Sequence, residues 1–151
     1  MTIIEDSRQQ AGKHELKHAH FGLMHILFYR CKLPVGDYAL PPAVAVDTKA
    51  DMQEIAQNIG GSTGEHVRFI NELKLARDIG TKLYVLIENT DGIESIEDVT
   101  RWRNPREAYS PKCIQGPQLA KAMRTIEGRY GCTFMFCRPE EAAETIIDLL
   151  R

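Results

Sequence analysis

The chain has 151 residues and a mass of 17.1 kDa, the size of one domain that can bury its own hydrophobic core. Apolar residues make up 43% and charged residues 26%, which excludes collagen-like, coiled-coil and disordered classes. No apolar run reaches the roughly 18 to 20 residues that span a bilayer, and the N-terminus shows no secretion signal. The four cysteines form no CxxC pair, which argues against a disulfide scaffold or a zinc ribbon. We therefore expect a cytoplasmic protein without a membrane partner.

Charge is unevenly distributed along the chain, although the net charge is only -2. Between Ser7 and Lys32 there are five Lys and Arg residues against one acid, and between Arg101 and Arg129 there are seven against two. Two basic segments can hold a phosphate backbone if the fold brings them to one face. The alternative is that they are two ordinary solvated faces.

The first part of the chain predicts two strands separated by a helix. Thr2 to Glu5 is β-branched and is predicted to form a strand that ends at Asp6. Gly12 to Met24 is predicted to be an amphipathic helix, and Ile26 to Lys32 a second strand. The apolar positions that indicate this helix are Leu16, Ala19 and Leu23.

Proline and glycine then divide the chain into turns and short strands. Asp37 to Leu40 leads towards a turn at Pro41-Pro42, and a strand is predicted from Ala43 to Lys49. Side chains two residues apart in a strand point to the same side, so Asp47 and Lys49 are expected to share one face.

The middle of the chain predicts two helices and a central strand. Met52 to Ile59 is a short helix that Gly60-Gly61 would stop, and Thr63 to Ile79 is a longer one. Lys82 to Glu88 is an apolar run typical of a buried central strand. The expected apolar side of the longer helix consists of Val67, Ile70, Leu73 and Ala76.

The last third begins with Ser95 and Asp98, whose spacing resembles a capping box opening a short helix to Trp102. The segment Asn104 to Pro117 is predicted to be a loop. Further elements are predicted as a helix from Gln118 to Arg129, a strand from Cys132 to Cys137 and a helix from Pro139 to Leu150. This alternation predicts an α/β domain, with an antiparallel element where strands are too tightly linked for crossovers.

Two carboxylates and a lysine form the most informative group in the sequence. Asp37 and Asp47 lie on neighbouring predicted strands, and Lys49 follows two residues after the second acid. Metal-assisted phosphodiester hydrolysis needs such a set, because carboxylates hold a hard cation and an ammonium group stabilises developing charge. We expect the three groups to surround one solvent-open pocket.

An acid followed two residues later by lysine is a weak pattern by itself. The same spacing occurs at Glu15-Leu16-Lys17 and Glu72-Leu73-Lys74, but both lie in predicted helices, where residues i and i+2 do not share a face. The alternative for Asp47 and Lys49 is an ordinary ion pair on a surface strand.

The order of several segments resembles the XPF-type nuclease domain of the PD-(D/E)XK superfamily, especially its single-domain members in bacteria and phages. The resemblance covers nearly the whole chain and implies a restriction-endonuclease-like mixed central sheet flanked by helices. It also implies a single nuclease domain over residues 1–151, encoded by a bacterium or a phage, without the separate helix-hairpin-helix module of many relatives. The segments that carry it are IIEDSR at residues 3–8, LPVGDY at 33–38, VDTK at 46–49 and HVRFINELKLARDIGTKLYVLIE at 66–88, with GPQLAKA, RYG and FMFC further on.

The resemblance implies roles for five residues. Asp37 and Asp47 would be metal ligands for Mg²⁺ or Mn²⁺, Lys49 the catalytic lysine, and Asp6 a further acid lining the metal site. Arg8 would lie on the phosphate side and contact DNA.

Three positions depart from the better-known eukaryotic and archaeal members. Thr48 stands where those relatives have arginine, and Gln53 stands where they have an acid. Gln53 could still ligate the metal through its carbonyl oxygen or a water. Gln9 replaces a further acid that follows the first Asp-x-Arg in those relatives.

Other side chains allow two interpretations each. Arg68 and Glu72 lie one helical turn apart and could form an ion-pair brace, which we favour, or reach the metal site. His14 and His18 share a helical face, but no third ligand follows, so a solvated or phosphate-facing helix is favoured over zinc. Trp102 could stack on a base, although a single tryptophan belongs more often to the core.

The sequence therefore predicts a divalent-metal-dependent deoxyribonuclease, an endonuclease that uses an activated water. The alternative is a catalytically silent nuclease-fold module that binds DNA or a protein. Specificity for branched DNA or for single/double-strand junctions would have to come from a homodimer or a partner. Besides Arg8, the expected DNA-binding residues are Lys13, Lys17, Arg101 and Arg103.

Overall fold

The computed structural model describes residues 2–10, 12–40, 44–61 and 63–151. The predicted turn at Pro41-Pro42 and the predicted start of a strand at Ala43 lie outside these ranges. Within them, no helix has both the length and the apolar character needed to cross a bilayer.

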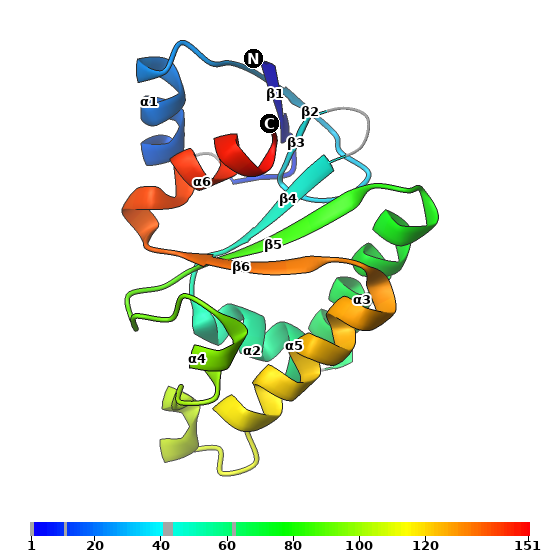
Figure 1. The fold of residues 1–151 in the computed structure, drawn as a ribbon, viewed down its shortest axis with the longest axis vertical. Coiled ribbons are helices and arrows are strands. Elements are labelled where there is room, and N and C mark those ends of the chain that lie inside the picture. The colour runs from blue at the N-terminus through cyan, green and yellow to red at the C-terminus, as the bar shows by residue number, and fades with distance from the viewer. Residues whose placement is uncertain (1, 11, 41–43, 62) are drawn as a thin grey trace.

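A six-stranded mixed sheet forms the centre of the molecule, with the strand order β2-β1-β3-β4-β5-β6 (Figure 1). Strand β1 pairs parallel with β2 and antiparallel with β3, and β3 pairs antiparallel with β4. Strands β4, β5 and β6 are parallel. The predicted α/β fold with a mixed central sheet is therefore confirmed. The strands are β1 (Thr2–Asp6), β2 (Leu27–Cys31), β3 (Tyr38–Leu40), β4 (Val44–Lys49), β5 (Lys82–Glu88) and β6 (Thr133–Cys137).

Helices cover both faces of the sheet (Figure 1). Helices α2, α3, α4 and α5 lie below it in this view, whereas α1 and α6 lie above it near both chain termini. The helices are α1 (Glu15–Leu23), α2 (Met52–Gly60), α3 (Thr63–Asp78), α4 (Ile96–Val99), α5 (Gly116–Tyr130) and α6 (Ala142–Leu149), with 3-10 turns η1 (Pro105–Ala108) and η2 (Pro139–Glu141).

Each face of the sheet has its own hydrophobic core. The larger core packs α2, α3 and α5 against Ala45, Val85 and Ile87 of the central strands. The smaller core joins α1 and α6 to Tyr38 and Val46 on the other face. Because side chains alternate along a strand, neighbouring residues of β3 and β4 serve opposite cores.

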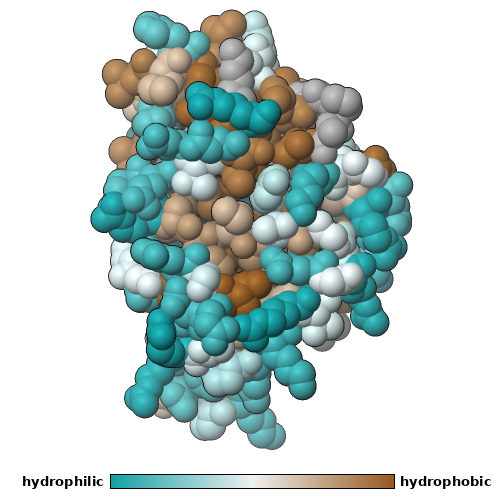
Figure 2. All heavy atoms as spheres, viewed as in Figure 1, coloured by the Kyte–Doolittle hydropathy of each residue, from teal (hydrophilic) through white to brown (hydrophobic). Residues whose placement is uncertain are grey.

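Helix α1 packs by a different side from the one its apolar pattern indicates. Leu16 and Leu23 are 83% and 80% exposed, and Ala19 is exposed as well. The buried side of the helix is formed by Phe21 and by polar groups that contact the sheet. The prediction that a helix forms here is therefore confirmed. The prediction of which side of the helix is buried is wrong. Figure 2 shows hydrophobic residues at the surface in this upper region of the molecule.

This packing predicts that Leu16→Ser and Leu23→Ser leave the free energy of unfolding unchanged within about 0.5 kcal/mol. Phe21→Ala, at a fully buried position of the same helix, should lower it by about 3 kcal/mol through the cavity it creates. Urea denaturation followed by circular dichroism measures both. A loss above 1 kcal/mol for either serine variant would contradict the placement of α1.

Two other predicted helices differ in detail. In α3, Phe69, Leu73 and Ala76 are buried, but Val67 is exposed, so the predicted apolar side is wrong at that position. Helix α5 begins at Gly116 rather than at Gln118, because a proline fits the first turn of a helix and Pro117 occupies it. The predicted loop before α5 is therefore shorter and includes η1. Trp102 belongs to the larger core, as favoured.

Candidate active site

The ends of three strands bring the predicted acids into neighbouring positions. The amide N–H of Asp6 at the end of β1 donates to the carbonyl of Asp37, 2.7 Å away. The amide N–H of Asp37 in turn donates to the carbonyl of Val46, 2.8 Å away, one residue before Asp47. Gly36 precedes β3 with a φ of 75°, in the left-handed region that favours glycine, and this turn leads the chain into Asp37.

Asp47 and Lys49 point to the same side of β4, as the strand spacing predicts. In the register with β5 they lie opposite Val85 and Ile87, on the face covered by α2 and α3. Lys49 Nζ lies 2.8 Å from Oδ2 of Asp47. Apart from this ion pair, the buried Oδ2 has no polar partner among the described residues. Asp47 and Lys49 are only 5% and 8% exposed.

The carboxylate of Asp37 accepts hydrogen bonds from Thr48 and Gln9, two of the residues that depart from the better-known relatives. Its Oδ2 accepts the backbone N–H of Thr48 at 2.8 Å and the Thr48 hydroxyl at 2.6 Å. Its Oδ1 accepts the side-chain amide of Gln9. Thr48 and Gln9 therefore orient Asp37, a role that an arginine or an acid at these positions would not fill in the same way.

Glu72 joins this group from helix α3. Its Oε1 accepts the backbone N–H of Gly36 at 2.7 Å, which fastens the turn before Asp37 to the helix. Arg68 and Glu72 form no ion pair in the described part of the chain, so the favoured brace between them is wrong. We call Asp37, Asp47 and Glu72 the acidic cluster.

Burial and mutual repulsion raise the pKa values of the acidic cluster. Burial raises the pKa of Asp47 to about 6, because the Lys49 ammonium only partly opposes it and the charge of Asp37 adds to it. Burial also raises the pKa of Asp37, against hydrogen bonds from Thr48 that lower it. The pKa of Glu72 is raised by burial and then by the charge of Asp47. An added cation would relieve this repulsion.

Lys49 is the positive group of the site. Burial lowers the pKa of Lys49, but the charge and contact of Asp47 outweigh this effect, so the pKa lies above its usual value. The side chain is therefore an ammonium ion at neutral pH. It can stabilise negative charge but cannot accept a proton there.

Asp6 and Arg8 form a pair at the edge of the acidic cluster. Arg8 Nη2 lies 2.5 Å from Oδ2 of Asp6, and the same guanidinium donates to the carbonyl of Leu33 at 2.9 Å. Burial raises the pKa of Asp6, but the hydrogen bonds and charge of Arg8 outweigh it and hold the pKa below its usual value. The charge of Arg8 also opposes the rise in the pKa of Glu72. Arg8 is itself exposed.

A hollow of about 290 Å³ opens beside the acidic cluster, and we call it the Lys49 hollow. Lys49 and Glu72 line it, whereas Asp37 and Asp47 are not among its lining residues. Asp37 is half-buried and Asp47 is buried, and neither of them lines this hollow. The residues that line the Lys49 hollow are Lys49, Glu54, Gln57, Asn58, Glu65, Arg68, Phe69 and Glu72.

The first turn of α2 turns Gln53 away from this hollow. Gln53 lines a separate hollow on the other flank of α2, so the structure does not bring it to the acidic cluster. Glu54, one residue later, lines the Lys49 hollow instead, and its Oε2 accepts the backbone N–H of Ala50 at 2.8 Å. The sequence analysis missed Glu54. Its position three residues after Asp51, whose side chain caps α2, could have indicated it.

The donor set fits a hard divalent cation. Asp37 and Asp47 offer carboxylate oxygens, and one oxygen of Asp47 has no polar partner besides Lys49 among the described residues. Mg²⁺ is typically held by one or two carboxylates, with waters and substrate phosphates completing its shell. No three His, Cys, Asp or Glu side chains of the described ranges group so that they could hold a metal ion by themselves.

The predicted DNA-binding residues lie in different places. Lys13 is exposed before α1. Lys17 Nζ lies 2.6 Å from Oε1 of Glu88 with only 12% of its side chain exposed, on the sheet face opposite to Lys49. The structure therefore gives Lys17 an internal partner and does not bring it to the site. Arg101 and Arg103 are both exposed near α4.

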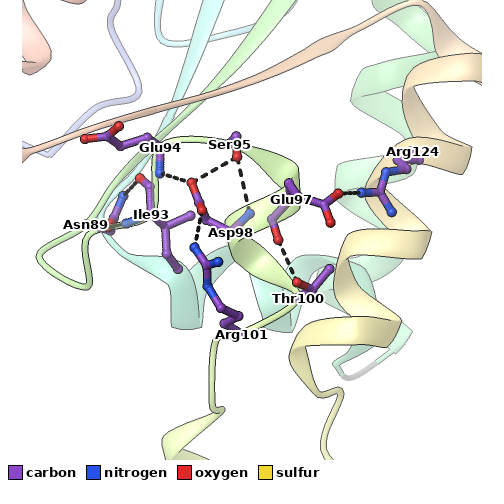
Figure 3. A network of polar contacts seen from close by, with 9 residues as sticks. All are labelled: Asn89, Ile93, Glu94, Ser95, Glu97, Asp98, Thr100, Arg101 and Arg124. Carbon is purple, nitrogen blue, oxygen red and sulfur yellow. Dashed lines mark hydrogen bonds and ion pairs between the residues drawn. The ribbon is translucent and has the colours of Figure 1, made fainter.

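Arg101 takes part in a local network around α4 (Figure 3). Its Nη2 lies 2.5 Å from Oδ1 of Asp98, and Arg124 reaches Glu97 from α5 at 2.6 Å. The Ser95 hydroxyl donates to Asp98 at 2.9 Å, and Ser95 accepts the Asp98 N–H, which confirms the predicted capping interaction. The exposed guanidinium of Arg101 is thus partly neutralised by Asp98.

His14, just before α1, and His18 within it both contact residues of the sheet. His14 is buried and hydrogen bonds to the Tyr38 hydroxyl, and His18 contacts the carboxylate of Glu5. The favoured interpretation of a solvated or phosphate-facing helix is therefore wrong for this side of α1. Burial lowers the pKa of His14 to about 4, so His14 is neutral at physiological pH.

The comparisons with known proteins bear on the fold. No protein-family model and no curated protein matches the sequence. The structure resembles XPF from Aeropyrum pernix with a TM-score of 0.69 and 16% identity, over 100% of this chain and 64% of that chain. It resembles the same organism's XPF in complex with DNA with a TM-score of 0.68 and 18% identity, over 99% and 63%. The chain therefore spans less than two thirds of either matched chain. The XPF-type nuclease fold that the sequence resemblance implied is confirmed.

Proposed function

We propose that this chain is a divalent-metal-dependent DNA endonuclease that hydrolyses phosphodiester bonds with an activated water. One observation carries the proposal: Asp37, just before β3, lies beside β4, where Asp47 pairs with Lys49, within an XPF-type nuclease fold. DNA as the substrate is supported by the resemblance to an XPF structure in complex with DNA.

Each residue of the site has a chemical task in this proposal. Asp37 and Asp47 would hold Mg²⁺ or Mn²⁺, which when bound supplies Lewis-acid polarisation of the phosphate and a nucleophilic water at neutral pH. The Lys49 ammonium would stabilise the charge that develops on the phosphate oxygens. Thr48 keeps Asp37 oriented through two hydrogen bonds.

Arg8 and Asp6 would serve the substrate side of the site. The Arg8 guanidinium is exposed beside the acidic cluster and can contact a phosphate, and Asp6 fixes its direction. In this arrangement Asp6 is tied to Arg8 and would act on the metal through its charge.

A second candidate is a DNA-binding module without catalysis. It is favoured by the fact that both oxygens of Asp37 already accept hydrogen bonds from Thr48 and Gln9. Recognition of branched or junction DNA by either candidate would require a homodimer or a partner.

Incubation of the purified chain with plasmid, single-stranded, flap and fork DNA separates the two candidates. We expect cleavage with Mg²⁺ or Mn²⁺ and none with a chelator. Binding without any cleavage, at every metal concentration, would favour the silent module.

Mg²⁺ should also stabilise the fold in the absence of DNA. A ligand that binds only the folded state at about 100 times its Kd adds about 2.7 kcal/mol, which raises Tm by roughly 5 to 10 °C for a chain of this size. Thermal melting with increasing Mg²⁺ measures the shift. Asp47→Asn should remove it, whereas Asp78→Asn, an exposed acid at the end of α3, should keep it.

A further inference from the structure

A second hollow of about 210 Å³ lies between α2 and the segment that contains η1, and we call it the Arg106 hollow. Its polar lining includes Gln53, Gln57, Asn104, Arg106, Ser110 and Lys112. Two of these side chains are cationic, and no lining residue is acidic. Within the described ranges neither Arg106 nor Lys112 forms an ion pair, so both charges remain available to an anion.

The two hollows are neighbours on helix α2. Gln53, Gln57 and Gly60 follow one stripe of the helix and line the Arg106 hollow. Glu54, Gln57 and Asn58 lie on the adjacent flank and line the Lys49 hollow. Gln57 lines both hollows, so a chain of phosphates that reaches Lys49 can continue across α2 to Arg106.

The two hollows differ in charge. The Lys49 hollow contains three carboxylates, Glu54, Glu65 and Glu72, against two cations. The charged residues that line the Arg106 hollow are both cationic. A polyanion held over the acidic side of the site needs an attractive surface next to it, and the Arg106 hollow supplies one.

Hydrogen bonds and close packing fix the segment that forms one wall of the Arg106 hollow. Asn104 donates to the carbonyl of Ile114 at 2.9 Å and accepts the backbone N–H of Arg106 at 3.0 Å. The N–H of Ser110 donates to the carbonyl of Arg106 at 2.7 Å. A Cβ on Gly60 would lie 2.8 Å from Cβ of Ile114, so the glycine allows this segment to pack directly against α2.

A free donor also faces this region. The side-chain nitrogen Nε2 of Gln53 is buried and has no hydrogen-bond partner in the described part of the chain. Buried polar groups without a partner are few in native proteins and call for an explanation, such as an absent ligand. Gln53 itself lines the hollow.

We propose that the Arg106 hollow binds a backbone phosphate of the same DNA strand whose phosphates reach Lys49. Arg106 and Lys112 supply the charge, and the side-chain amides of α2 supply hydrogen bonds. The inference rests on the proposed function, since the ligand is the same DNA.

The test measures the affinity of a fluorescein-labelled 30-base-pair duplex by anisotropy at several salt concentrations, in chelator so that no DNA is cut. For Arg106→Gln with Lys112→Gln, we expect affinity to fall roughly tenfold or more at low salt, and the slope of log affinity against log salt to flatten by about two. The matched control is Arg138→Gln with Arg151→Gln, which removes the same charge from exposed positions flanking α6 and should leave the slope unchanged.

Two further variants keep the test decisive. Arg106→Lys with Lys112→Arg should restore the wild-type slope, because the charges remain. Should the double glutamine variant fail to fold, Lys112→Glu at an exposed position should still weaken binding. Wild-type affinity and slope in the variant that lacks both charges, or in Lys112→Glu, would overturn the inference.

A small phosphodiester separates this inference from the proposed function. Bis(p-nitrophenyl) phosphate is too small to occupy both hollows, so its Mn²⁺-dependent hydrolysis should be the same in the double glutamine variant and in wild type. If wild type binds DNA and hydrolyses the small ester but all salt slopes agree, the Arg106 hollow alone is rejected. If wild type neither binds DNA nor hydrolyses the ester, both proposals fail.

Discussion

Asp47→Asn is expected to reduce DNA cleavage by roughly 10³-fold or more, while DNA binding is retained or strengthened. The substitution keeps the shape of the side chain but removes the charge that would hold the cation. It also removes repulsion between the buried Asp47 and the phosphates of the substrate. Asp37→Asn should act in the same way. Rates on supercoiled plasmid with Mg²⁺, and anisotropy with labelled duplex in chelator, measure the two quantities.

Asp78→Asn is a suitable control. This exposed acid at the end of α3 forms an ion pair with Arg77 and with no other described residue. It should cleave and bind as wild type does. Undiminished cleavage by Asp47→Asn would reject the mechanism. Equal loss of cleavage and binding would instead show that Asp47 holds the fold or the DNA.

Lys49→Met is expected to lower cleavage by roughly 10² to 10³-fold and to move the remaining activity to higher pH. Asp47 must be ionised to hold a cation, and the pKa of Asp47 is about 6 with Lys49 beside it. Lys49 lowers this pKa, so its removal raises it, and a carboxyl with a higher pKa is ionised only at higher pH. Wild-type cleavage at limiting Mg²⁺ should therefore rise through about pH 6, and that of Lys49→Met above it.

Lys49→Arg keeps the positive charge and is the matched control for the pH shift. Its rate depends on how the larger group fits, but its activity should begin to rise near the wild-type pH. A pH profile of Lys49→Met that coincides with wild type would contradict the pairing of Lys49 with Asp47.

The strands in the parallel half of the sheet could be predicted because their residue types are typical of buried strands. Lys82–Glu88 is apolar on both faces, and β-branched and aromatic residues mark the neighbouring strands. Helix α3 was predictable for its length but not for each buried position. Phe69 rather than Val67 faces the core, on the same side of the helix as Leu73 and Ala76.

Helix α1 shows the limit of hydrophobic periodicity. Its inner side carries Lys17 and His18, which contact the buried acids Glu88 and Glu5 of the sheet. A pattern of apolar residues cannot reveal a helix that packs through ion pairs. The partners lie 71 and 13 residues away in the sequence, so only the fold shows why these polar residues point inward.

The chemical group at the site was predictable in part. Strand spacing placed Asp47 and Lys49 on one face, Asp37 was expected on the neighbouring strand, and the resemblance added Asp6. The roles of Thr48 and Gln9 could not be predicted, because both act through the position of Asp37 at a strand end. Glu54 was missed because the first turn of α2 determines which of two neighbouring side chains faces the site.

Asp6 at the end of β1 and Asp37 just before β3 each adjoin a residue that faces α1. Asp6 follows Glu5, and Asp37 precedes Tyr38; Glu5 and Tyr38 are both almost completely buried. The acidic site could not be transplanted into another scaffold by moving the strands alone. The new scaffold would have to provide hydrogen-bond partners for the buried carboxylate of Glu5 and the buried hydroxyl of Tyr38 on the opposite face of the sheet. The smallest portable unit is the strands together with α1, even though that helix contributes no group to the chemistry.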